Sequence, residues 1–257
     1  MLGKLLKYEI PALGRKLVPL YIAWAATAVL LGLMIGPIEG KSEFMMVLSA
    51  MLYSGVAAAV FVMAVVMIVQ RFNRSLLGDE GYFSHVLPVK ASQHIASKTI
   101  SATLWVLLSG VAMAVTGLII AIASGSFMQL FQIDWHEFLN ELFGAPIVGV
   151  YIVEVIIAFI LSIAKSILAI YTALTIGHQA SKRVGLASIG AYIVLMICES
   201  MIGNIILSIA PGAPLFYPET SGDVAVLLLC AILITLLISG IYFFICKYLM
   251  EKKLNLA

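Results

Sequence analysis

Charged residues are scarce in this chain of 257 residues: Lys, Arg, Asp and Glu make up 11% of it, whereas hydrophobic residues make up 63%. A soluble domain carries about 25% charged residues, so this sequence has too few to cover a surface that faces water. Cysteine is scarce too, and all three cysteines lie inside apolar runs, which argues against a disulfide framework. The composition therefore predicts an all-α integral membrane protein.

Motifs for catalysis, nucleotides and metals are also missing. Gly40-Lys41-Ser42 resembles the end of a phosphate-binding loop, but Ile35 stands where the spacing requires glycine. His136-Glu137 begins like a zinc-protease helix, but Asn140 stands where the second histidine belongs. The four histidines are scattered over different loops, without metal-ligand spacing. We therefore expect no catalytic residues, no metal or cofactor bound by this chain, no enzymatic activity of its own and no nucleic-acid partner.

What the sequence does contain is six long apolar runs. Crossing about 30 Å of hydrocarbon takes about 20 apolar residues in a helix. The runs are residues 17–36, 44–69, 101–124, 146–176, 184–211 and 224–246. The sequence thus predicts six transmembrane helices that form a single domain over residues 1–257.

Basic residues gather on one side of these predicted spans. Thirteen of the fifteen Lys and Arg residues lie in residues 1–16, 70–100, 177–183 and the tail from 247 onward. The connections on the other side hold only Lys41 as a basic residue and seven acidic ones. Because loops rich in Lys and Arg stay inside the cell, both termini and the two basic loops are predicted to be cytoplasmic.

Residues 1–16 have a pattern of their own. Leucines at positions 2, 5, 6 and 13 recur at helical spacing against Lys4, Lys7 and Lys16. This spacing predicts an amphipathic interfacial helix in the cytoplasmic headgroup layer, bent or interrupted at Pro11. A basic segment that only sets the topology is the alternative.

The outer connection, residues 125–145, is the longest on its side and is not simply polar. Large apolar residues recur every three or four positions: Phe127, Phe131, Trp135, Phe138 and Leu142. This period predicts an outer cap, either a short amphipathic helix or a re-entrant hairpin. Packing of the same residues against the spans is the alternative.

Three ionisable residues lie within predicted spans: Glu154, Lys165 and Glu199. Such groups are costly in lipid and usually face a bundle interior or a water-filled path. Glu154 and Lys165 are eleven residues apart, so they share one helix face about 16 Å apart and do not pair directly. We predict a polar seam, defined by these three residues, that lines a substrate path or a subunit interface. The alternative is a purely structural role, with Lys165 snorkelling and the glutamates bonded to nearby hydroxyl groups.

The most distinctive stretch is residues 70–100, between the second and third predicted spans. It contains the run DEGYFSHVLPVKASQHIASK, residues 79–98, in which a turn-rich, acidic and aromatic segment precedes a helix that begins at Ala91 or Ser92. This run resembles the signature D-E-G-Y-x-x-x-x-L-P-V-x-x-x-x-x-x-x-S-K of bacterial ABC transporter permeases of the type-2 class. The opening MLGKLLKYEI is similar to the start of those subunits. The tetrapeptide Phe83-Ser84-His85-Val86 departs from the pattern, which is rich in Leu and Thr there.

The resemblance implies the transmembrane subunit of an ATP-driven exporter in the bacterial cytoplasmic membrane, with a cytoplasmic coupling loop in residues 70–100. ATP and Mg would bind to a separate ABC ATPase, present in two copies, and a second permease copy would complete a homo- or heterodimer. The residues that fall in the ATPase-coupling loop by position are Asp79, Glu80, Gly81, Tyr82 and Pro88. The nearest relatives in kind export antimicrobial or toxin-like peptides, such as bacitracin, lantibiotics or phenol-soluble modulins, so the expected substrate is an amphipathic peptide.

Two other functions remain open at this point. An ion-coupled secondary transporter could use Glu154, Lys165 and Glu199 as a relay, although such carriers show inverted repeats with broken helices, and we see no convincing repeat. A scaffold for immunity or sensing could bind a peptide without transporting it, but it would have no use for an ATPase-coupling loop.

Overall fold

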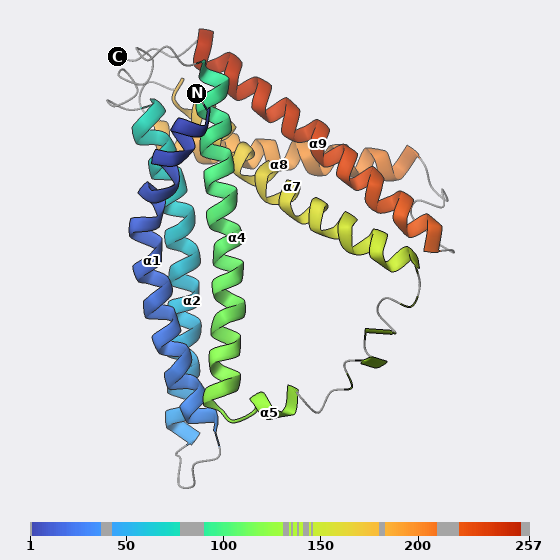
Figure 1. The fold of residues 1–257 in the computed structure, drawn as a ribbon. Helices are drawn as coiled ribbons and strands as arrows, with labels where there is room; N and C mark the ends of the chain where they lie inside the picture. Colours follow the sequence, from blue (N-terminus) through green and yellow to red (C-terminus); the bar gives the residue numbers. More distant parts are fainter. Residues whose placement is uncertain are drawn as a thin grey trace.

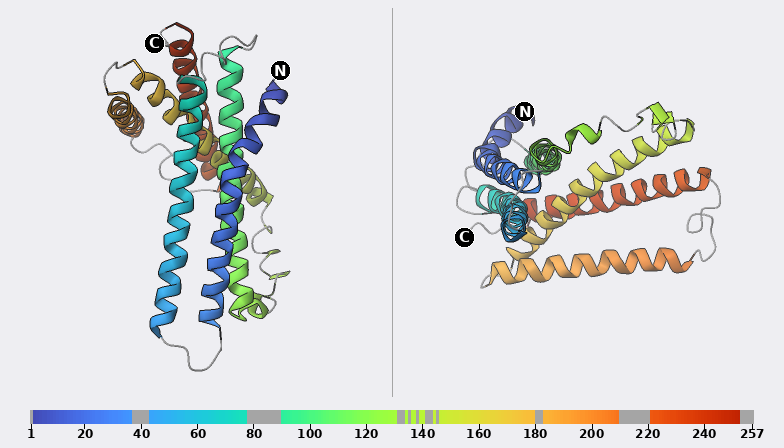
Figure 2. Two further views of the ribbon diagram at one scale, coloured as in Figure 1. Left: turned by 90° about the vertical axis from the view of Figure 1, so that its left-hand side faces the viewer. Right: turned by 90° about the horizontal axis from the view of Figure 1, so that it is seen from below.

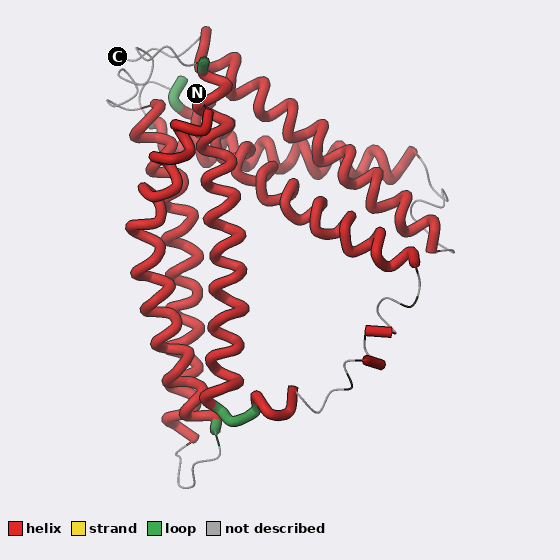
Figure 3. The backbone as a smooth tube through the Cα atoms, viewed as in Figure 1, coloured by secondary structure: helices red, strands yellow, loops and turns green. Residues whose placement is uncertain are grey.

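Every element in the part of the chain that the structure describes is helical (Figures 1 and 3). This computed structural model describes residues 2–36, 43–77, 90–130, 134, 136–137, 139–140, 144, 146–179, 183–209 and 221–252. Its elements are α1 (Leu2–Ile35), α2 (Glu43–Phe72), the π-helix η1 (Asn73–Leu77), α4 (Ala91–Ala123), α5 (Phe127–Leu130), α7 (Pro146–Gly177), α8 (Val184–Ile209) and α9 (Ser221–Lys252). Within these residues six helices are long and apolar enough to cross a membrane. The prediction of an all-α, multi-pass membrane protein is confirmed.

Each predicted span overlaps one of the long helices, and three of the helices extend furthest beyond their spans. α1 begins at Leu2, before the span predicted from residue 17; α4 begins at Ala91, before the span predicted from residue 101; and η1 prolongs α2 to Leu77, beyond residue 69. These three helices have 34, 33 and, with η1, 35 residues, or about 50 Å each. The hydrocarbon layer takes up about 30 Å of that length. An apolar run therefore marks the part of a helix that suits lipid, but not the residue where the helix ends.

The described parts of residues 70–100 are helical as well, apart from Lys90. Residues 70–77 continue α2 through η1, and α4 begins at Ala91, as the sequence predicted. The backbone of Lys90 is extended there, and its carbonyl accepts hydrogen bonds from the N–H groups of Gln93 and His94. The residues predicted to couple to an ATPase, at positions 79–82 and 88, lie outside the described residues.

The prediction of a separate interfacial helix at residues 1–16 needs correction. These residues are helical, but they continue without a break into the first span, and Pro11 and Pro19 both lie inside α1. The N-terminal turns lean away from the line of the remaining helix (Figure 2). Leu13 and Leu17 are buried in a cluster with Ala64 and Met67 of α2 and Trp105 of α4. The end of this segment thus packs against α2 and α4, whose own extensions lie beside it.

The outer cap predicted for residues 125–145 is described only in pieces. α4 ends in a turn with Gly125 at a φ of 78°, a backbone conformation that favours glycine, and the four residues of α5 follow. Further on, the Asp134 carboxylate accepts hydrogen bonds from the N–H groups of His136 and Glu137. Phe131, Trp135, Phe138 and Leu142 lie outside the described residues.

The six long helices form two groups of three. α1, α2 and α4 run side by side, whereas α7, α8 and α9 lean away from them (Figures 1 and 2). α1 lies very close to α4 at Gly32, where a Cβ atom would lie 2.5 Å from the Cβ of Ala123. The two groups meet at the end where α1 begins and α9 ends (Figure 1), and there α4 packs against α7 and α9. We call this end the joined end.

The main hydrophobic core lies at the joined end. It unites residues of α2, η1, α4, α7 and α9: Ile68, Phe72, Leu76, Leu77, Ile95, Ala102, Ile167, Leu168, Ala169, Tyr171, Tyr242, Cys246 and Met250. At its centre the rings of Phe72 and Tyr171 are stacked, with 3.9 Å between their centroids. Many large apolar side chains elsewhere on the described helices are exposed, as expected of surfaces that face lipid. Burial against protein is therefore concentrated where the two groups meet.

Replacing Phe72 with alanine should destabilise the protein more than the same change at Phe61 on the same helix. Phe72 is 0% exposed and stacks on Tyr171, whereas Phe61 is 65% exposed. A buried Phe→Ala change costs about 3–5 kcal/mol because it leaves a cavity. Thermal unfolding in detergent would measure both variants, and equal melting temperatures would contradict this account of the core.

Candidate functional site

Glu9 is the acidic centre of an ionic cluster at the joined end. Its Oε1 accepts a hydrogen bond from Nζ of Lys98 at 2.8 Å, and its Oε2 accepts one from Nε of Arg71 at 3.0 Å. The side chain of Lys98 is 4% exposed and that of Glu9 14%, while Arg71 is partly exposed at 39%. One carboxylate thereby joins three helices: α1 through Glu9, α2 through Arg71 and α4 through Lys98. We call these residues the Glu9 cluster.

The Glu9 cluster joins the two helices that flank residues 78–89 in the sequence. Arg71 precedes this segment on α2, and Lys98 follows it in the second or third turn of α4. The indole N–H of Trp105 donates a hydrogen bond to the carbonyl of Ile10 at 3.0 Å, which adds a second link between α1 and α4. Both helices that lead into and out of the segment are therefore fixed to the start of α1.

The sequence contained a signal for Glu9 that our reading of it missed. Glu9 follows Leu5 and Leu6 and precedes Leu13 at helical spacing, so it is an acid within an otherwise apolar stripe. An acid at such a position is buried only with a cationic partner. The partners could not be named from the sequence alone, because they are 62 and 89 residues away.

Replacing Glu9 with glutamine should destabilise the joined end. Glutamine keeps the size of the side chain but removes the negative charge beside the enclosed Lys98, and breaking one side of a buried ion pair costs about 3 kcal/mol or more. The control is Glu137→Gln, because Glu137 is exposed. Hydrogen exchange of residues 2–17 and 91–105 would report the change, and unaltered protection in Glu9→Gln would refute the role of the cluster.

A second ionic cluster joins the three helices of the other group. Lys165 of α7 donates a short hydrogen bond to Oε1 of Glu199 of α8. The hydroxyl of Tyr242 on α9 donates to Oε2 of the same carboxylate at 3.3 Å. The side chains of Lys165 and Glu199 are 19% and 23% exposed. Each helix contributes one member, so this cluster ties α8 to α7 and α9.

Glu154, the third residue of the predicted polar seam, lies elsewhere on α7. The sequence placed it on the same face as Lys165, and the half-buried residues of α7 do follow that stripe: Tyr151, Glu154, Ala158, Leu161 and Lys165. Its Oε2 atom is buried and has no hydrogen-bond partner within the described part of the chain. The structure therefore pairs two residues of the predicted seam and leaves Glu154 apart. Tyr242 was missed, since one tyrosine in an apolar run gives no signal.

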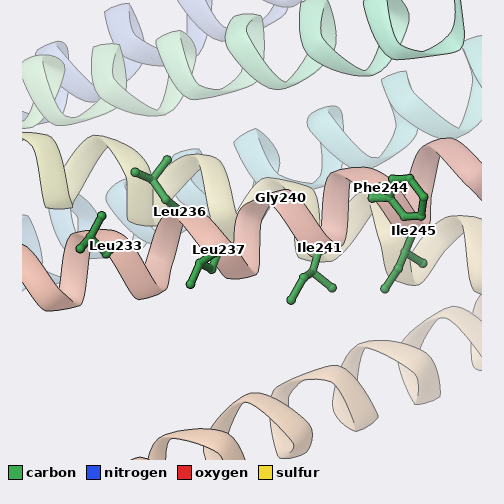
Figure 4. A pocket seen from close by; sticks show the side chains of 7 residues that line it. All are labelled: Leu233, Leu236, Leu237, Gly240, Ile241, Phe244 and Ile245. Carbon is green, nitrogen blue, oxygen red and sulfur yellow. The ribbon is translucent and has the colours of Figure 1, made fainter.

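A groove of about 640 Å³ runs along α9, and its described lining is wholly apolar. Figure 4 shows Leu233, Leu237 and Ile241 along this helix, with Gly240 between them. No ionisable residue is among those that line the groove. Nor do three His, Cys, Asp or Glu side chains gather into a metal site in the residues that the structure covers. The two ionic clusters and Glu154 are thus the candidate polar sites within the described helices.

The pairing of Lys165 with Glu199 can be tested by exchanging the two charges. Lys165→Met should destabilise the protein by about 2 kcal/mol, because the Glu199 carboxylate loses its cation in an apolar setting. The double variant Lys165→Glu with Glu199→Lys should recover part of that loss. Thermal unfolding in detergent measures all three proteins. A double variant that is no more stable than Lys165→Met would show that the two charges are independent.

No family model, no curated protein and no solved structure matches the chain.

Proposed function

We propose that this chain is the membrane-spanning subunit of an ATP-driven exporter, similar to the type-2 ABC permeases. Two chains would form the translocation path and move an amphipathic substrate, best a toxin-like or antimicrobial peptide, out of a bacterial cell. A separate ABC ATPase in two copies would bind ATP and Mg and hydrolyse the ATP. Both termini would then lie in the cytoplasm, and the joined end would face the ATPase.

The observation that carries this proposal is the Glu9 cluster, which joins the two helices that flank residues 78–89 in the sequence. The motif that resembles the coupling loop of the permeases occupies most of this segment, and its flanking helices are fixed to α1 by Arg71, Lys98 and Glu9. A soluble ATPase can move membrane helices only if the element it pushes is firmly attached to them. Flanking helices that are ion-paired to α1 and packed into the main core meet that mechanical need.

The joined end also suits the transmission of force to both helix groups. Phe72 of α2 stacks on Tyr171 of α7, so a displacement of the end of α2 acts directly on the second group. α4 contacts α7 and α9 in the same region. A push on residues 78–89 would thus tilt the two groups relative to each other, which is the motion that alternating access requires.

An ion-coupled secondary transporter is the second candidate. The Lys165–Glu199 pair favours it, because charges within membrane spans often mark an ion or proton path. Such carriers typically bind their substrate where helices are broken near the midplane. α7, α8 and α9 are each continuous over their described lengths, which favours the exporter.

Co-purification tests the exporter directly. A tagged chain isolated from its native host should bring down an ABC ATPase and hydrolyse ATP. Replacing Asp79, Glu80 and Tyr82 with alanine together should abolish the association, because these residues would form the docking surface. Replacing Asp134 and Glu137 with alanine is the matched control at the opposite end of the helices and should leave the association intact.

A second outcome of the same purification would contradict the exporter. A chain that purifies alone and drives proton-dependent flux in vesicles would establish the secondary transporter and exclude the exporter. In that case Lys165→Met and Glu199→Gln should stop the flux.

A further inference from the structure

Glu154 is the one uncompensated charge among the ionisable groups of the predicted polar seam. Lys165 and Glu199 neutralise each other across α7 and α8, so the three residues together carry a net charge of −1. One oxygen of Glu154 is buried without a hydrogen-bond partner in the described chain. A carboxylate in such a place is strongly unfavourable unless a cation or a proton compensates it.

The surroundings of Glu154 are apolar and partly open. On the same helix Val150, Val153 and Ile157 lie within one turn, and each is exposed. No group of three His, Cys, Asp or Glu side chains that could hold a metal ion forms among the described residues, and a divalent metal ion would need several oxygen ligands. A ligand with a single cationic head and an apolar body therefore fits this site better than an inorganic ion does.

We propose that Glu154 binds the cationic head of an amphipathic molecule, an amine or a guanidinium group, while the apolar body lies against the exposed side chains of α7. The head would form a charge-assisted hydrogen bond with the carboxylate. Glu154 lies about 16 Å along α7 from Lys165, on the side away from the joined end, so the site belongs to the opposite half of the helix. The identification of this ligand as transported cargo rests on the proposed function; the binding site itself does not.

The test measures the binding of octylamine and octanol to the whole chain in nanodiscs of zwitterionic lipid. The two probes have the same apolar tail and differ in the charge of the head, and empty discs correct for partition into lipid. The wild-type protein should bind octylamine at least about tenfold more tightly than octanol, as a charge-assisted hydrogen bond predicts. Glu154→Gln should lose this preference, and Glu43→Gln, a change at an exposed acid, should retain it.

Two results would overturn the proposal. One is an equal affinity of the wild-type protein for both probes, which would show that the charge of the head is not recognised. The other is an unchanged preference in Glu154→Gln, which would place the recognition of the amine elsewhere. If Glu154→Gln does not fold, Glu154→Asp takes its place: it keeps the charge but withdraws it by one methylene, so the preference should fall but persist.

The octylamine and co-purification experiments distinguish a failure of the proposed binding site from a failure of the proposed exporter. A chain that binds octylamine through Glu154 but brings down no ATPase would retain the binding site and lose the exporter. A chain that brings down an ATPase but shows no preference for octylamine would retain the exporter and lose the binding site.

Discussion

The enclosure of Lys98 by Glu9 is the interaction on which the joined end depends. A lysine that is almost fully buried is tolerated only with a counter-charge, and the counter-charge here comes from the first turns of α1. Those turns must therefore stay helical and packed against α4, although a basic segment with a proline would suit the membrane surface. The same carboxylate also holds Arg71, so the ends of α2 and α4 are placed relative to each other by one residue near the start of the chain.

Buried residues are concentrated at that end. In hydrocarbon, apolar helices gain little by packing apolar side chains together, because lipid tails are equally apolar. At the joined end, by contrast, helices of both groups meet, and there Phe72, Ile95 and Tyr171 are fully enclosed. In the opposite direction the two groups of helices diverge (Figure 1). The two groups of helices are thus packed together at the joined end and are apart at the other end.

The sequence was a good guide where one physical rule dominates. The length of apolar runs located all six long helices, and the residues after Pro88 located the start of α4 at Ala91. The sequence was a poor guide where interacting residues are distant in the chain or where two physical effects oppose each other. Pro11 and the lysines of residues 1–16 favoured a separate helix at the membrane surface, but the burial of Leu13 and Leu17 against neighbouring helices prevailed. Glu154, Lys165 and Glu199 were expected to form one polar seam, yet only Lys165 and Glu199 are in contact, because the tilt and stagger of two helices cannot be read from spacing within each.

The π-helix at Asn73–Leu77 sets the direction in which the chain leaves α2. A π-turn holds one more residue than an α-turn, and each residue of an α-helix rotates the chain by about 100°. The inserted residue lets the consecutive Leu76 and Leu77 both enter the core. It also turns the exit of the chain through that angle before residue 78. Deletion of one residue here would therefore rotate Leu76 and Leu77 relative to α2 and remove one of the two from the core.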